Sequence, residues 1–379
     1  MNYFRKTLGF IVLALIFCPV GLSFADINVG VISSMTTGLA QLGQRQINSA
    51  ILAAEEWNAK GGIKGEKIKL IIEDSGDSTT MAITALDRVL GKNPCAVLGP
   101  IYSFQLFALF PEVQKEKIVL ISTSGTRELT QKNNPWYFRL YPHDGFIKRV
   151  CATFAADELK SKRPAIMCVT TEYGKSGHEI LVKTLKEKGV TPVAETWHGK
   201  EDKDMTGQLM SIKRANPDVI ISQAHPADTA VLLKQQRDLG INVPHVASSA
   251  ASMPTVHALV GDGMKGVYVE AVAEPNYDPD PKLQAWTKKY SGKFNTQPDS
   301  FAVPYYDAAN FLFEAIKTVG PDRVKIAEWF RKNTYKGLAG NYAFDNEQNG
   351  AFFAIMLQYH MKEGKAIPSV VKKYDFTGK

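Results

Sequence analysis

One segment of the sequence, residues 97–126, restricts the fold more than any other. It contains an apolar run ending at Leu98, a polar loop, an amphipathic stretch from about Phe104, a second apolar run over residues 118–121, and another polar loop. This order predicts a strand, a helix and a second strand parallel to the first, since parallel strands need a long crossover, usually a helix. In an open parallel sheet, the loops after such strands face one crevice, where small ligands bind.

Hydroxyl groups are concentrated in the two loops of this segment. Ser103 lies in the first loop, and Ser124 and Thr126 lie in the second. Together with backbone N–H groups near a helix N-terminus, these hydroxyls favour a bound anion such as a carboxylate. The alternative is that they only cap helices, as Ser and Thr often do.

The same alternation of strand and helix continues through the chain and restarts after Pro142. A length of 379 residues with 45% hydrophobic composition predicts at least two domains. The Pro- and Asp-rich stretch 273–281 indicates a crossover between them. We therefore predict an α/β protein with two doubly wound lobes of about five strands each. Predicted strands cover residues 26–33, 68–73, 95–98, 118–121, 164–169, 193–197, 218–222, 245–248, 266–272 and 351–360, and a last strand follows a turn at residues 363–364.

The N-terminus has the pattern of a secretory signal peptide. Arg5 and Lys6 precede an apolar run over residues 8–17, and a small-x-small cleavage site ends at Ala25. The apolar run is too short to span a bilayer. We therefore expect residues 1–25 to be removed and the mature chain to be soluble outside the cytoplasm. The competing interpretation is a retained N-terminal anchor.

Charge and cysteine content exclude two classes of protein. Loss of residues 1–25 lowers the formal charge from +7 to +5, and the remaining basic residues are scattered and often adjacent to acidic ones. That pattern is typical of solvated helix faces and not of a nucleic-acid-binding stripe. The mature chain keeps Cys95, Cys151 and Cys168, an odd number without close spacing. A disulfide scaffold is therefore not expected, and the sequence leaves a single pair open.

Enzyme motifs are missing from the sequence. The seven histidines show no metal-binding spacing, and there is no Gly-x-Ser-x-Gly elbow or Gly-x-x-x-x-Gly-Lys-Ser/Thr loop. Ser103 and His225 both lie in predicted strand-end loops, and one interpretation is a nucleophile and base that meet across the crevice. The other is that His225 caps the following helix or lines the crevice. We predict a binding protein without catalytic residues, metal site or cofactor.

Several segments together resemble the periplasmic solute-binding proteins of the leucine/isoleucine/valine type, which serve ABC importers. The resemblance covers nearly all of the mature chain and rests on the order and spacing of residues 37–43, 59–65, 99–103, 121–126, 128–130 and 173–174. It implies the type I periplasmic binding protein fold, in which two Rossmann-like lobes are joined by a three-segment hinge and close over a ligand. Lobe 1 would contain residues 26–142 and 273–346, and lobe 2 residues 143–272 and 347–379.

The resemblance also implies where a ligand would lie. Ser103 and Thr126 match residues that hold the α-carboxylate and ammonium groups of amino acids, with help from the backbone of Tyr102 and Ser124. Tyr173 matches an aromatic residue that lobe 2 places over the ligand. The expected ligand-binding residues are Leu42, Tyr102, Ser103, Ser124, Gly125, Thr126, Tyr173, Ala224 and Ser249.

Three of these positions depart from the family pattern. Ser249 stands where amino-acid binders have a Glu for the ammonium group, Leu42 stands where a Tyr is usual, and Ala224 replaces an aromatic residue. A buried ammonium group needs a paired carboxylate. The departures therefore favour a small carboxylate without an α-amine, such as an aromatic or branched aliphatic acid. The alternative is a branched-chain amino acid whose ammonium group is bound by Glu172 or Asp228.

Partners and location also follow from the resemblance. It implies a periplasmic monomer that binds a small molecule and the permease subunits of an ABC importer in the inner membrane, and no nucleic acid. The alternative is a sensor subunit that uses the same cleft to report its ligand to a receptor or regulator.

Overall fold

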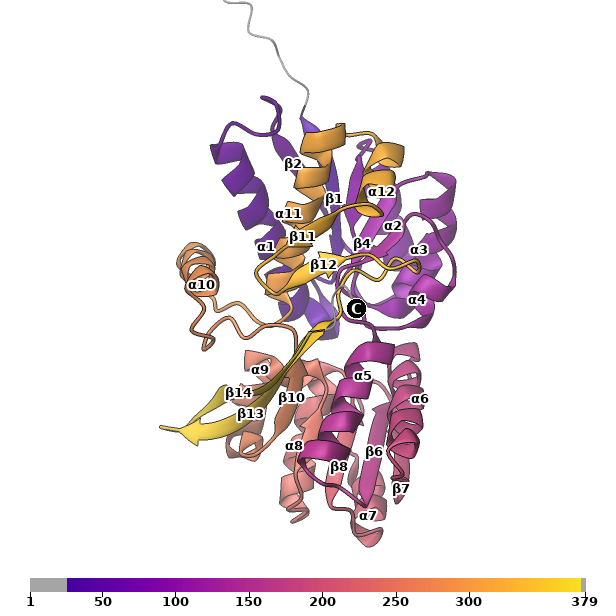
Figure 1. Cartoon of the computed structure of the whole chain (residues 1–379), viewed down its shortest axis with the longest axis vertical. Helices are drawn as coiled ribbons and strands as arrows, with labels where there is room; N and C mark the ends of the chain where they lie inside the picture. Colours follow the sequence, from indigo (N-terminus) through magenta and orange to yellow (C-terminus); the bar gives the residue numbers. More distant parts are fainter. Residues whose placement is uncertain (1–25, 376–379) are drawn as a thin grey trace, which may run out of the picture.

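The computed structural model describes residues 26–375, so the predicted signal peptide lies outside the described residues. The chain forms two α/β lobes, one above the other in Figure 1, each built on its own sheet. Lobe 1 is the sheet with strand order β2-β1-β3-β4-β5 and its helices. Lobe 2 is the sheet with strand order β14-β13-β10-β9-β8-β6-β7 and its helices. The predicted α/β class with two doubly wound lobes is confirmed.

The strands of lobe 1 are all parallel. Helices cover both faces of the sheet, so the inner strands are buried on both sides, which explains the unbroken apolar runs in the sequence. The strands are β1 (Ile27–Ser33), β2 (Ile68–Asp74), β3 (Ala96–Leu98), β4 (Val119–Ser122) and β5 (Tyr137–Arg139).

The helices of lobe 1 come from two parts of the chain, and α1 packs against α11. Gly43 in α1 is required for the close approach of this helix to the end of β1. A Cβ atom at Gly43 would lie only 1.7 Å from the carbonyl oxygen of Ser34. The helices are α1 (Ala40–Ala59), α2 (Thr79–Leu90), α3 (Ser103–Lys115), α4 (Glu128–Gln131), α10 (Pro281–Phe294), α11 (Ala302–Val319) and α12 (Arg323–Phe330).

Lobe 2 combines five parallel strands with a C-terminal antiparallel hairpin. Its strands are β6 (Pro164–Val169), β7 (Ala194–His198), β8 (Val219–Gln223), β9 (His245–Ala247), β10 (Tyr268–Ala271), β13 (Phe353–Lys362) and β14 (Lys365–Asp375). Its helices are α5 (Asp144–Thr153), α6 (Glu172–Glu187), α7 (Thr206–Arg214), α8 (Pro226–Asp238) and α9 (Pro254–Val260). A π-helical turn, Phe154–Glu158, extends α5.

The chain passes between the lobes three times. The crossings lie between β5 and α5, between β10 and α10, and between β12 (Asn341–Ala343) and β13. The sequence analysis predicted neither β5 nor the small hairpin of β12 with β11 (Thr334–Lys336). Short loops follow the carboxyl ends of the parallel strands in both lobes, and these loops meet between the lobes.

Cys95, Cys151 and Cys168 are buried and free, and burial raises the pKa of each thiol to about 12. Within residues 26–375, no helix combines the length and the apolar composition needed to cross a bilayer.

Candidate functional site

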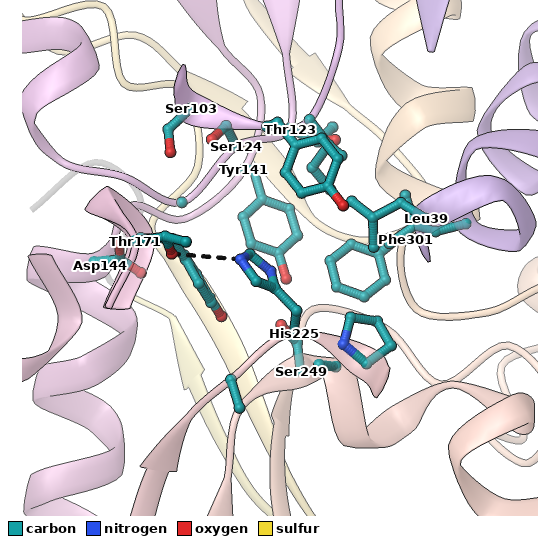
Figure 2. Close-up of a pocket in the computed structure, with 18 of the residues that line it drawn as sticks. Leu39, Ser103, Thr123, Ser124, Tyr141, Asp144, Thr171, His225, Ser249 and Phe301 are labelled. Atoms are coloured by element: carbon teal, nitrogen blue, oxygen red, sulfur yellow. Dashed lines mark hydrogen bonds between the residues drawn. The ribbon is translucent and has the colours of Figure 1, made fainter. Parts of the chain in front are cut away.

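One enclosed cavity lies between the two lobes, and Figure 2 shows the side chains around it. The space open to the centre of a water-sized sphere is about 70 Å³. A single water needs about 10–15 Å³ by this measure, so the cavity has room for a small organic molecule. Its walls are formed by loops after β3, β4, β6, β8 and β9 and by segments at the lobe crossings.

Eight of the nine sequence-predicted residues line this cavity. They are Leu42, Tyr102, Ser103, Ser124, Gly125, Tyr173, Ala224 and Ser249. The ninth, Thr126, points into a second, more open cavity beside α3 and α6. Its hydroxyl oxygen is buried and has no hydrogen-bond partner among residues 26–375.

The lobe 1 wall has the features of an anion-binding surface. Tyr102 is the N-cap residue of α3 and Ser103 is its first residue, so the first N–H groups of this helix lie next to the cavity. Ser124 lies beside Ser103 in Figure 2. Two hydroxyls and a helix N-terminus therefore converge where a carboxylate can be held.

Buried Arg139 fixes the loop that carries Ser124. Its guanidinium group donates hydrogen bonds to the carbonyl oxygens of Gly125 (3.3 Å) and Thr126 (2.6 Å). On the other side of the loop, the Gln46 amide donates to the Thr123 hydroxyl (2.9 Å). Arg139 and Gln46 thus hold the loop in place although neither of them lines the cavity.

Aromatic rings close the cavity from lobe 2. The rings of Tyr173 and His225 stack with centroids 5.4 Å apart, and His225 meets the ring of Tyr102 from lobe 1 edge-on at 5.7 Å. Burial lowers the pKa of His225 to about 4, so this ring is neutral at pH 7. Its Nε2 lies 3.4 Å from the Thr171 hydroxyl, the contact drawn in Figure 2.

Two further aromatic residues were missed by the sequence analysis. Tyr141, at the first lobe crossing, stacks on Phe301 at a centroid distance of 5.8 Å, and both line the cavity. Tyr141 follows β5 and Phe301 directly precedes α11, so the two residues are far apart in the sequence and no local pattern links them.

Lys200 of lobe 2 reaches across the cleft to lobe 1. Its Nζ lies 3.2 Å from a carboxylate oxygen of Asp77 and 5.1 Å from the centre of the Tyr102 ring. An ion pair and a cation–π contact therefore join the lobes at the edge of the site.

A buried carboxyl group, Asp144, lines the cavity and was also missed. Its backbone N–H donates to the Gly125 carbonyl oxygen (2.7 Å), and its Oδ1 accepts from the Gln223 amide (3.3 Å). Its Oδ2 is buried without a hydrogen-bond partner in the described part of the chain. Burial raises the pKa of Asp144 to about 6, against the opposing effects of Lys148 and Arg139. In the sequence, Asp144 looks like an ordinary acidic residue at a helix start.

A second buried carboxyl group, Glu270, also faces the cavity and forms an ion pair with Lys148. Each of these two side chains is only 1% exposed. Burial is the main influence on Glu270 and raises its pKa, while Lys148 opposes that rise.

The comparison with known families decides the identity of this fold. A family model described as "Periplasmic binding protein" matches residues 26–365. The chain belongs to this family. The predicted resemblance and the type I fold are thereby confirmed.

Relatives of this periplasmic binding protein cover almost its whole length. The leucine-, isoleucine-, valine-, threonine- and alanine-binding protein of Pseudomonas aeruginosa is 23% identical over 87% of this chain and 89% of the relative. A solved leucine-binding protein of Thermotoga maritima has a TM-score of 0.84 at 23% identity, covering 92% of this chain and 99% of that one. A Rhodopseudomonas palustris solute-binding protein in complex with 3,4-dihydroxybenzoic acid has a TM-score of 0.83 at 18% identity, covering 93% of this chain and 97% of that one.

The family consists of solute-binding proteins, and none of these comparisons indicates a catalytic family. In the periplasmic binding protein described here, His225 lines the same cavity as Ser103, and its Nε2 is within hydrogen-bond distance of the Thr171 hydroxyl. Among residues 26–375, no group of three or more His, Cys, Asp and Glu side chains could hold a metal ion.

The two acidic residues suggested for an ammonium group do not line the central cavity. Glu172 faces the second cavity, and Asp228 accepts a hydrogen bond from the backbone N–H of Glu201 at 2.6 Å. Ser249 does line the central cavity. Two carboxyl groups that the sequence analysis did not name, those of Asp144 and Glu270, line it as well.

Proposed function

We propose that this periplasmic binding protein is the ligand-capturing component of an ABC importer, and that its lobes close over a small carboxylate or amino acid. The observation that carries the proposal is the enclosed cavity with an anion-binding wall on lobe 1 and aromatic residues on lobe 2. The relatives include an amino-acid-binding protein and a protein in complex with an aromatic acid, which supports the same class of ligand. Closure by a hinge is the usual motion for two lobes joined by crossover segments.

Within this proposal, the ligand carboxylate lies against Ser103, Ser124 and the N-terminus of α3. Asp144 then supplies the acidic group that Ser249 lacks. Its unpartnered Oδ2 faces the cavity, and a buried acceptor without a partner is unfavourable. A ligand ammonium group would satisfy it, so an α-amino acid is compatible with this cavity.

The remaining expectations complete the proposed function. The signal peptide is cleaved after Ala25, the mature protein is a periplasmic monomer, and its partners are the permease subunits of the importer. The lobe limits proposed from the sequence, 26–142 with 273–346 and 143–272 with 347–379, are supported by the positions of the three crossings.

Calorimetry with matched ligand pairs tests the proposal. L-leucine and L-phenylalanine are compared with 4-methylpentanoate and 3-phenylpropanoate, which lack only the amine. We expect saturable binding of at least one compound at one site per chain, and mass spectrometry should recover that ligand unchanged. Absence of binding across both sets, or turnover of a bound compound, contradicts the proposed function.

The pH dependence of binding separates the two ligand classes. Burial is the largest influence on Asp144 and raises its pKa; Glu270 adds to this rise, Lys148, Arg139 and Gln223 oppose it, and the pKa is about 6 in the free protein. A bound ammonium group lowers this pKa, so the complex holds fewer protons and affinity falls as the pH drops below about 6. A carboxylate without an amine raises the pKa, so its affinity increases over the same range. Calorimetry between pH 5 and 8 measures the sign directly.

Replacing Ser103 by Ala should weaken binding by about 1–3 kcal/mol, because a desolvated ligand oxygen loses its hydrogen bond. Ser211 on α7 is half-buried, and its hydroxyl bonds to Gly207 and Arg214 of its own helix, so Ser211→Ala is the matched control and should bind like the parent. Equal affinity of Ser103→Ala and the parent would place the carboxylate elsewhere.

A further inference from the structure

The lobe 2 side of the cavity contains a buried charged pair, and the carboxyl group of Asp144 lies close enough to interact electrostatically with both of its members. Glu270 comes from β10 and lines the cavity, whereas its partner Lys148, from α5, does not line it and lies behind the carboxylate. The neighbouring lining residues Ile147, Ala250 and Phe301 are apolar. We call Glu270 with its partner Lys148 the charged floor.

A buried ion pair of this kind needs an explanation beyond stability. Removing two charges from water is costly, and apolar residues of similar volume are often neutral or better for the fold. Both side chains of the charged floor are 1% exposed, so the full penalty applies. Packing alone does not account for a glutamate at this position in the wall of a ligand cavity.

One carboxylate oxygen of Glu270 is available to accept a further hydrogen bond. One oxygen, Oε1, accepts from the Lys148 ammonium group. The other, Oε2, is buried and makes no well-formed hydrogen bond within residues 26–375, although the backbone N–H and the hydroxyl of Ser249 lie close to this carboxylate. The hydroxyl of Tyr141, which also lines the cavity, is likewise without a well-formed partner there, and Ser249 lies close to it as well.

The geometry also separates this acceptor from the anion-binding wall. Figure 2 shows Ser103 and Ser124 on one side of the cavity and Ser249, the neighbour of Glu270, on the opposite side. A carboxylic acid held by the lobe 1 wall would therefore direct its far end toward the charged floor.

We propose that Glu270 binds a hydrogen-bond donor at the far end of the ligand, so that the protein selects ligands with a hydroxyl, amide or amine there over purely aliphatic or aromatic ones. This inference rests on the proposed function and names the ligand class within it. Lys148 is a positioning residue, because it holds the carboxylate and neutralises its charge without touching the ligand.

Calorimetry with nearly isosteric pairs tests this selectivity on the mature protein. The pairs are threonine with valine, asparagine with leucine, tyrosine with phenylalanine, and 4-hydroxybenzoate with benzoate. In the pair that binds most tightly, we expect the donor-bearing member to bind at least tenfold more tightly than its partner. Equal or tighter binding of the apolar member overturns this inference and leaves the proposed function intact. If none of the eight compounds binds, the proposed function fails together with this inference.

The double variant Lys148→Met/Glu270→Leu removes both charges of the charged floor and leaves Arg139 as the cation that acts on Asp144. We expect it to bind the apolar member of the same pair at least as tightly as the donor-bearing member. The control is Arg149→Gln/Glu187→Gln, an exposed ion pair on α5 and α6, which should keep the parental preference. A folded double variant that also keeps this preference contradicts the inference. If the double variant does not unfold cooperatively, and so is not properly folded, the inference is judged on the parent protein alone, by its preference for the donor-bearing ligand.

Discussion

Replacing Lys148 alone by Met should lower the free energy of unfolding by about 3–5 kcal/mol, the usual cost of leaving a buried charge without its partner. Glu270 would remain 1% exposed with no cation beside it. Urea denaturation at pH 7 measures the loss. The double variant Lys148→Met/Glu270→Leu should recover most of it, because both charges are then absent. A loss below about 1 kcal/mol in the single variant would mean that water reaches the carboxylate.

The free energy of unfolding that the Lys148→Met variant loses should also depend on pH. Burial raises the pKa of Glu270 and Lys148 opposes this rise, so removal of Lys148 raises the folded-state pKa further above its unfolded value. A group of this kind stabilises the fold while it is protonated and loses that contribution as the pH rises through the folded pKa. The deficit of the single variant is therefore largest at high pH and becomes small near pH 4, close to the unfolded value of about 4.3.

Replacing Gly43 or Gly174 by Ala should each destabilise the protein by about 3 kcal/mol, at the upper end of the overpacking range. A Cβ atom at Gly43 would lie 1.7 Å from the carbonyl oxygen of Ser34, and one at Gly174 would lie 1.8 Å from that of Val169. Both obstacles are backbone atoms, so no side chain can rotate to make room. Thermal unfolding followed by circular dichroism measures the change.

Gly292 provides the control for these two variants. It lies inside α10, and a Cβ atom added there would have no other atom within 4 Å, so Gly292→Ala should stabilise the protein by about 0.5–1 kcal/mol through reduced backbone entropy. Destabilisation by all three substitutions to a similar degree would contradict the close-approach argument.

The sequence predicted the elements and the hydroxyl loops because both depend on local patterns. The strand over residues 164–169 matches β6 because its apolar run is bounded by polar residues on both sides. Ser103 and Ser124 were placed at one cavity by the rule that parallel strands end at one edge. These inferences need no knowledge of distant contacts.

The charged groups of the cavity could not be found in this way. Glu270 lies within a predicted strand and Lys148 lies 122 positions earlier, so the sequence shows two ordinary charged residues. Asp144 faces the cavity only because the chain crosses between lobes just before α5. Thr126 was placed with Ser124 by proximity in the sequence, yet its side chain faces the second cavity.

Lys200 has a consequence for how long a ligand stays bound. Its contacts with Asp77 and the Tyr102 ring join different lobes, so they exist only while the lobes are together. A ligand that first meets an open cleft arrives before these contacts form, whereas a ligand that leaves must wait until they break. With the proposed closure of the lobes, we expect Lys200 to lower the dissociation rate and to leave the association rate almost unchanged. Because the ion pair is partly exposed, added salt weakens it and shortens the residence time of the ligand.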